Sequence, residues 1–180
     1  MARLFLIICL FCSICCFSQQ ENEKIKWQEN QPLVWSDFKG KPVALSPFKA
    51  NTNAGISFSW SYSSKNGVAK LDYVIESFFY PQSSWKKEII KKDYLLAHEQ
   101  VHFDIAELHA RKFRKAISEY EIGENIKKDL IALYKKFEQQ QKAMQQKFDS
   151  DTNHSKIEEE ELKWREFVQE ELKKYKAYID

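Results

Sequence analysis

The sequence predicts an α+β fold in which a small antiparallel β-sheet is followed by three α-helices, the first of which carries an H-E-x-x-H motif in a zincin-like arrangement. Three observations predict this class. Apolar and serine side chains alternate over residues 56–63, which is typical of a strand. Beyond Pro81 there is no proline, and apolar residues recur at three- and four-residue steps, which is typical of amphipathic helices. With only 4 Gly and 4 Pro in 180 residues, a turn-rich all-β fold is disfavoured.

Residues 1–18 are predicted to be a signal peptide. Arg3 precedes an apolar run over residues 4–17, and small residues stand where a signal peptidase reads. Because the run is shorter than the roughly 20 residues that span a bilayer, an uncleaved anchor is the weaker alternative. We expect a secreted or periplasmic protein with no membrane span after cleavage. Lipidation at Cys15 or Cys16 ranks second, since neither follows Gly or Ala.

Cysteine usage and charge narrow the possible chemistry. All the cysteines lie in this leader, so the mature chain has no disulfide and no thiolate ligand: Cys9, Cys12, Cys15 and Cys16. Any metal must therefore be held by His, Asp or Glu. The 28 Lys and Arg against 26 Asp and Glu leave a net charge of +2, so nucleic acid is not an expected partner.

The mature chain is predicted to begin with a loose, polar segment over residues 19–31. A single α+β zinc-binding domain then covers residues 32–180, with its β part at 32–80 and its helical part at 83–180. Within the β part, Pro32 to Lys41 is predicted as a short strand entering a turn.

A β-hairpin is the strongest strand prediction. Apolar side chains at positions 56, 58, 60 and 62 alternate with serines, Asn66-Gly67 provides the turn, and residues 68–80 return as the second strand. The edge of that second strand is predicted to hold an extended peptide.

Three helices are predicted after Pro81. Ser83 or Ser84 would cap the first, which begins at Trp85, and Gly123 separates it from the second. Polar residues 149–155 are predicted as the loop before the third helix. The acidic run 158–161 would complement the dipole at the start of that helix.

His98, Glu99 and His102 form the H-E-x-x-H motif. Residues four apart lie about 40° apart around a helix and about 6 Å along it, so two imidazoles can bind one Zn²⁺. Glu99 then flanks the ion, where its carboxylate can take a proton from a metal-bound water. We predict His98 and His102 as metal ligands and Glu99 as the catalytic base.

Two residues are candidates for the third ligand. His154 stands in the predicted polar loop, which can fold back over the metal. Glu121 follows His102 after eighteen intervening residues, a spacing found in metallopeptidases whose third ligand is a Glu on the next helix. His109 shares the face of His102 but lies about 10 Å further along the axis, too far to bind the same ion.

Four segments together are distinctive: Trp35-Ser36-Asp37-Phe38-Lys39-Gly40, Ser84-Trp85, His98 to Asp104, and Asp149-x-x-Thr152-x-His154. They resemble a family of small bacterial exported proteins of unknown function that is labelled predicted secreted zinc-dependent proteases. The likeness spans about residues 35–164 and implies peptidase activity. It also favours His154 over Glu121 as the third ligand. Ser155 stands where the family pattern has Gly.

The expected function is therefore that of a secreted zinc-dependent metallopeptidase acting on peptide or protein substrates, with Zn²⁺ held by His98, His102 and His154. A non-catalytic metal-binding module of the cell envelope is the alternative. A helical interaction protein with an incidental motif is the third possibility. The sequence gives no indication of oligomeric state.

Overall fold

The computed structural model describes residues 23–88 and 92–180; the predicted signal peptide lies outside these ranges. In the described part, a three-stranded antiparallel sheet has the order β1–β4–β3, and β2 pairs with β5 in a second small sheet. Three helices follow, so the predicted α+β class is confirmed. The elements are β1 (Ile25–Lys26), β2 (Ala50–Asn51), β3 (Ala54–Lys65), β4 (Val68–Phe79), β5 (Trp85–Lys86), α1 (Lys92–Ser118), α2 (Ile126–Asp151) and α3 (Glu158–Lys174).

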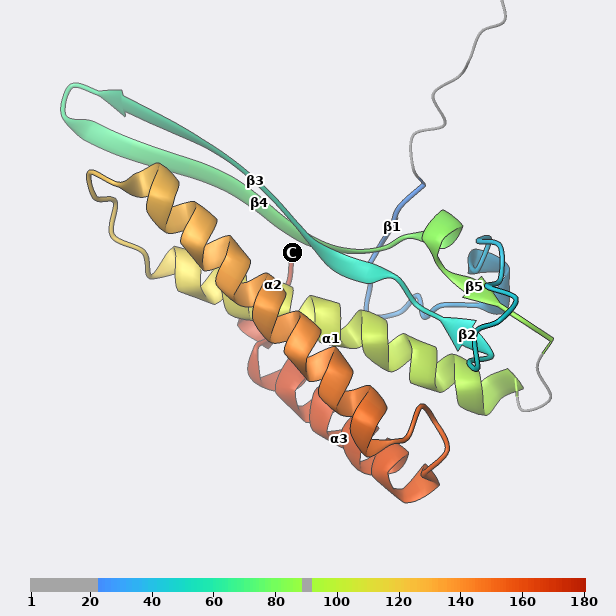
Figure 1. Ribbon diagram of the computed structural model, residues 1–180. Helices are drawn as coiled ribbons and strands as arrows, with labels where there is room; N and C mark the ends of the chain where they lie inside the picture. The colour runs from blue at the N-terminus through green and yellow to red at the C-terminus, as the bar shows by residue number, and fades with distance from the viewer. Residues whose placement is uncertain (1–22, 89–91) are drawn as a thin grey trace, which may run out of the picture.

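The long hairpin of β3 and β4 has the predicted turn and register. Asn66 and Gly67 have φ values of 52° and 77°, the left-handed pair that a two-residue hairpin turn requires. Pairing runs from Lys65↔Val68 to Ala54↔Phe79. Near its base the apolar face is buried against the helices, whereas its tip lies beside the start of α2 (Figure 1).

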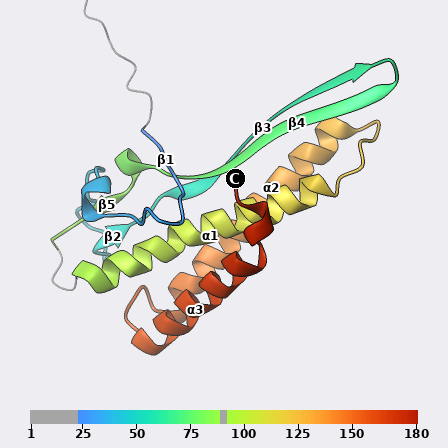
Figure 2. The ribbon, with the colours of Figure 1, turned by 180° about the vertical axis from the view of Figure 1, so that it is seen from behind.

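The central element is α1, which contacts α2, α3 and both strands of the hairpin (Figures 1 and 2). The predicted helical spacing is confirmed, since Ile105 and Leu108 of α1 are fully buried against Phe148 of α2 and Val168 of α3. Burying each such side chain contributes about 1.5–3 kcal/mol. Within the described residues, no helix combines the length and the apolar character needed to cross a bilayer.

The prediction of a loose segment over residues 19–31 is wrong for residues 23–31, the part that the structure describes. Ile25 and Lys26 form β1, which pairs antiparallel with the end of β4. Trp27 donates a hydrogen bond of 2.8 Å from Nε1 to Asp104 Oδ1 of α1. Half-buried Ile25 and Trp27 pack on the core, so two apolar residues in a polar stretch are enough to order this segment.

The strand predicted from Pro32 to Lys41 is also wrong, because side chains satisfy the backbone groups that a strand would pair. Val34 N donates to Asp37 Oδ2 at 2.7 Å, at the start of a 3₁₀ turn over Trp35–Asp37. Leu33 N donates to Gln100 Oε1 at 2.8 Å. Gly40 then passes so close to residues 82–84 that a Cβ would lie 2.7 Å from the carbonyl oxygen of Ser84. This position therefore needs glycine.

The first helix begins later than predicted. Trp85 and Lys86 form β5, and Ser84 Oγ accepts a hydrogen bond from Asn53 N at 2.9 Å instead of capping a helix. The described helix starts at Lys92. Pairing with β2 thus overrides the helical pattern at Trp85, and it draws residues 47–52 toward the motif on α1.

Candidate metal centre

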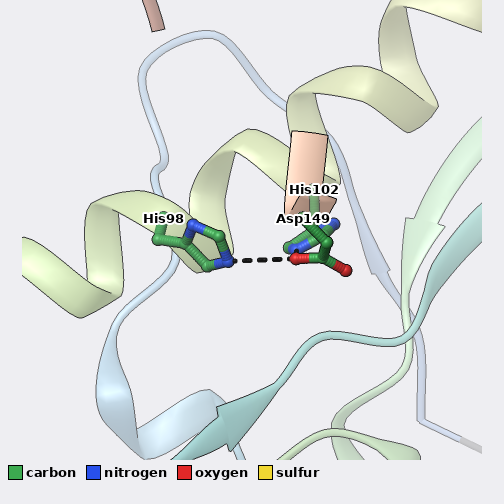
Figure 3. A group of neighbouring side chains, drawn as sticks. All are labelled: His98, His102 and Asp149. Carbon is green, nitrogen blue, oxygen red and sulfur yellow. Dashed lines mark ion pairs between the residues drawn. The ribbon is translucent and has the colours of Figure 1, made fainter. Parts of the chain in front are cut away.

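The two motif histidines lie on one face of α1 and are buried, with 4% and 7% of their surfaces exposed. The last turn of α2 brings Asp149 to them (Figure 3). Its Oδ1 lies 3.4 Å from His98 Nε2 and 3.2 Å from His102 Nε2. Phe148, which precedes Asp149, is fully buried and stacks on the His98 ring at 4.5 Å between centroids. This packing fixes the end of α2 against the histidines.

The arrangement fits a divalent metal ion. One ligand atom each from His98, His102 and Asp149 lies within 4.8 Å of the others. A tetrahedral zinc site with bonds of roughly 2.0–2.1 Å places its ligand atoms about 3.3–3.4 Å apart. The distances from Asp149 Oδ1 to the two histidine nitrogens, 3.4 Å and 3.2 Å, match that spacing, and two imidazoles with a carboxylate are ligands that zinc accepts.

Glu99 and the histidines share a pocket of about 570 Å³ with residues 47–52 and the loop after α2. Only 3% of Glu99 is exposed. Among the residues that the structure describes, neither Glu99 Oε2 nor His102 Nδ1 has a hydrogen-bond partner. Buried polar atoms are normally paired, so the unpaired carboxylate oxygen of Glu99, a residue that lines the pocket, indicates that another group belongs there.

The electrostatics of the site couple Asp149 to the histidines. Burial alone would raise the pKa of Asp149, but hydrogen bonds from His102 and His98 hold that pKa well below its ordinary value. Burial would likewise lower the pKa of His98, but hydrogen bonds to Asp149 and Glu161 raise it to about 9. The pocket thus favours a cation next to Asp149, either a proton on an imidazole or a metal ion.

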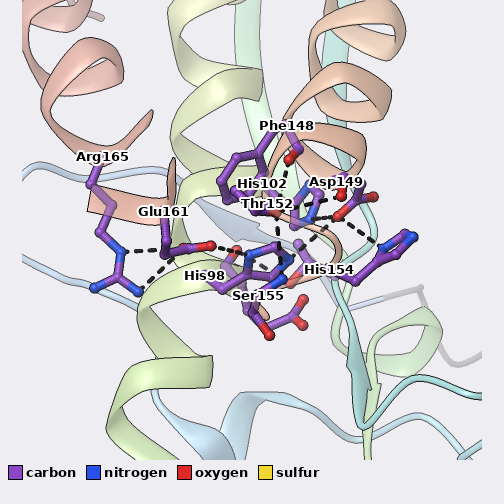
Figure 4. Close-up of polar contacts among 11 residues, drawn as sticks. His98, His102, Phe148, Asp149, Thr152, His154, Ser155, Glu161 and Arg165 are labelled. Atoms are coloured by element: carbon purple, nitrogen blue, oxygen red, sulfur yellow. Dashed lines mark hydrogen bonds and ion pairs between the residues drawn. The ribbon is translucent and has the colours of Figure 1, made fainter. Parts of the chain in front are cut away.

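His154 borders the same pocket but is not one of the three grouped ligand atoms. Its Nδ1 lies 3.4 Å from Asp149 Oδ1, and its ring packs on Phe48 at 4.2 Å between centroids (Figure 4). Its side chain is 40% exposed. The predicted ligand is therefore beside the site, on the side that opens to solvent.

The other candidates lie elsewhere. Glu121 is exposed in the connection between α1 and α2 and does not line the pocket. His109 donates from Nδ1 to the carbonyl oxygen of Ile105 at 2.9 Å and does not line the pocket either. The structure thus brings together His98, Glu99 and His102 with His154 nearby, and it leaves Glu121 apart.

Sequence reasoning missed two carboxylates of the site. The sequence predicts a loop from Asp149, but α2 continues to Asp151. The sequence predicts that Glu161 only complements the dipole of α3, but it is fully buried and its Oε2 lies 2.9 Å from His98 Nδ1. The sequence does hold a signal for Asp149: with 4 His and no cysteine beyond residue 16, Asp and Glu are the other residues that can complete a metal site.

Comparison with known proteins gives one match. Residues 40–155 match a family described as "Bacterial protein of unknown function (DUF922)". The matched region is more than half of the chain and contains the motif on α1, Asp149 and His154, whereas Glu161 and the rest of α3 lie beyond it. No curated protein and no solved structure matches.

Proposed function

Because the chain belongs to this bacterial family of unknown function (DUF922), whose description names no activity, we propose from the site itself that the protein is an exported zinc-dependent metallopeptidase. One observation carries the proposal. His98, His102 and Asp149 converge within 4.8 Å beside Glu99, a buried carboxylate with one unpaired oxygen at the wall of a pocket. Export rests on the sequence of residues 1–18.

In this proposal His98, His102 and Asp149 hold the ion, and His154 is the alternative third ligand. Bound zinc would act as a Lewis acid on the peptide carbonyl and lower the pKa of a water molecule toward about 7. Glu99 is the general base: its unpaired Oε2 accepts a proton from the attacking water and passes it to the leaving amine when the C–N bond breaks. The same carboxylate is then ready for another cycle.

An extended peptide would lie along residues 47–52 and not along β4. Because β4 lies between β3 and β1, its edge is not free beside Phe78 and Phe79, contrary to the sequence-based expectation. β2 pairs with β5 on one side only, and the segment around β2 lines the pocket. Thr52 Oγ1 also donates to the carbonyl oxygen of Glu99 at 3.3 Å, which ties this segment to the motif. Strand addition to such an edge is a common mode of peptide binding.

The test uses the leader-free chain loaded with one equivalent of zinc and a broad peptide library read by mass spectrometry. Glu99→Gln should bind zinc normally while its cleavage rate falls about 10²–10⁴-fold, the usual contribution of a general base. Glu88→Gln is the matched control, because Glu88 is an exposed carboxylate on the same pocket. Stoichiometric zinc with no cleavage of any peptide would favour the non-catalytic metal-binding module instead.

A further inference from the structure

We propose that Glu161 of α3 is a positioning residue of the metal centre, which holds His98 in the tautomer and orientation that present Nε2 to the ion. This inference rests on the metal site of the proposed function and adds a residue from outside the motif. In this inference α3 does more than pack against α1, because its Glu161 orients a metal ligand.

The contact between Glu161 and His98 determines which ring nitrogen is free. Glu161 Oε2 lies 2.9 Å from His98 Nδ1, and the carboxylate is fully buried (Figure 4). An ionised carboxylate only accepts hydrogen bonds, so Nδ1 carries the hydrogen. In the neutral ring Nε2 then has the lone pair, and Nε2 is the atom that faces Asp149. A carboxylate behind a ligating histidine also makes that histidine a stronger ligand.

Arg165 keeps Glu161 in place and balances its charge. Its Nε and Nη2 lie 3.3 Å and 3.2 Å from Glu161 Oε1, so both carboxylate oxygens are used. Nη2 also donates to the carbonyl oxygen of Tyr94 at 3.0 Å, and the guanidinium lies 5.2 Å from the centre of the Tyr94 ring. Because Arg165 supplies the positive charge, His98 can stay neutral, as a metal ligand must.

Glu161 differs from the other glutamates in the first turn of α3. Glu159 is exposed and pairs with Lys163 on the surface, as a residue that only complements the helix dipole would. Glu161 faces inward and reaches α1. It also lies beyond residues 40–155, the region that matches the family. The group that orients the first histidine is therefore supplied by a helix outside the matched region.

The test compares Glu161→Gln and Glu161→Ala with Glu159→Gln, the matched control, in the leader-free full chain. Zinc affinity is measured by competition with a chromophoric chelator. We expect Glu161→Ala to bind zinc about 10–100-fold more weakly, because this is the usual effect of removing the partner of a ligating histidine. Glu161→Gln keeps an acceptor for Nδ1–H and should lose less, and Glu159→Gln should match the wild type.

A second readout separates positioning from mere packing. In the zinc-loaded wild type, the His98 Nδ1–H proton should exchange slowly with solvent in NMR spectra, and in Glu161→Ala it should exchange fast. Unchanged zinc affinity and unchanged exchange in a folded Glu161 variant would overturn the inference while leaving the proposed function intact. If the wild type took up no zinc, the proposed function itself would fail, and the two failures are thereby distinguished. Should Glu161→Ala not fold, the Gln variant decides the question.

Discussion

The two halves of α1 each bury a polar cluster, and the two clusters differ in how their hydrogen bonds are completed. The first half holds His98, Glu99 and His102, with two unpaired polar atoms beside a pocket. The second half holds Glu107, Arg111 and Arg114, which pair with one another and with the backbone of distant segments. Both clusters are equally hidden from solvent, so burial alone does not distinguish them.

The second cluster is nearly closed. Glu107 accepts hydrogen bonds from both arginines, at 2.9 Å and 3.1 Å, and from Ser77 Oγ at 2.7 Å. Arg111 donates to the carbonyl oxygen of Leu172, and Arg114 donates to those of Ile75 and Tyr178. This network joins the sheet, α1 and the C-terminal segment.

One nitrogen of the second cluster, Arg111 Nη2, has no partner among the described residues, but that guanidinium lies over the Trp27 ring at 5.0 Å. Arg111 lines a separate pocket of about 430 Å³ with Asp104 and Gln100, and not the pocket that holds the motif. The comparison teaches that an unpaired atom beside a cavity indicates a functional site when ligand atoms also converge there, as those of His98, His102 and Asp149 do. A closed network indicates a structural role.

The largest expected effect is the loss of stability when the second cluster is disrupted. Glu107→Ala leaves two buried guanidinium groups without their carboxylate, and removing one partner of a buried ion pair costs about 3–5 kcal/mol. Urea denaturation of the metal-free protein measures this loss in the free energy of unfolding. Glu119→Ala is the control, because Glu119 pairs with Lys115 at the surface, and it should change stability by less than about 0.5 kcal/mol. A loss below about 1 kcal/mol for Glu107→Ala would contradict a structural role.

The next effect is a change in zinc affinity, which identifies the third metal ligand beside the first cluster. We expect Asp149→Ala to weaken zinc binding by about 100-fold or more, equivalent to about 2.7 kcal/mol, because it removes a ligand atom. His154→Ala should weaken binding by less than about 10-fold, since its ring lies beside the three grouped atoms. Isothermal titration with zinc compares the two. If His154→Ala has the larger effect, His154 is the ligand, as the sequence predicted.

A third effect concerns His109, which lies on α1 between Glu107 and Arg111. Burial lowers its pKa to about 4, although the Ile105 carbonyl partly opposes this shift. The unfolded chain binds this proton near pH 6.5 and the folded protein only near pH 4, so the stability that the neutral His109 contributes is full above pH 6.5 and is lost as the pH falls to 4. The loss is at most about 3.4 kcal/mol.

Denaturation of metal-free protein at several pH values measures the His109 effect, and His109→Leu should flatten the profile between pH 6.5 and 4. In this window His98 contributes little, because its raised pKa of about 9 keeps it protonated in the folded state and the unfolded chain is protonated as well. An unchanged slope in the variant would show that another group titrates there.

The smallest effect is a change in stability from substitutions in the loop between α2 and α3. Ser155 has φ 64°, in the left-handed region that favours glycine. Ser155→Gly should stabilise the protein by about 1 kcal/mol. Asn153→Gly, at φ 47°, should change stability by only a few tenths, about 0.3 kcal/mol, because Asn tolerates this region. Thermal melts compare the two, and equal shifts would argue against backbone strain at Ser155.

Most of the fold followed from local patterns. Alternation and Asn66-Gly67 were sufficient for the hairpin, because side-chain period and turn chemistry agree there. Prediction failed where long-range pairing decides: β1 depends on the end of β4, and β5 on β2, neither of which is near in sequence. Two-residue strands have no pattern of their own.

The site was predictable to the extent that one helix defines it. His98 and His102 share a face by their spacing alone, and Glu99 flanks them one residue along the helix. Asp149 and Glu161 were missed because their roles depend on where α2 ends and how α3 packs, which are tertiary properties. A polar stretch can be a loop or the last turn of a helix, and its composition does not decide between them.

The continuity of α1 from Lys92 to Ser118 has a consequence for how the chain can vary. One added or deleted residue between His102 and Glu107 would rotate everything beyond it by about 100° around the axis. The motif and the ionic network could not then both face their partners. The codons between His102 and Glu107 should therefore accept substitutions far more readily than insertions or deletions. In a library of single-codon insertions, functional variants should be missing from this stretch.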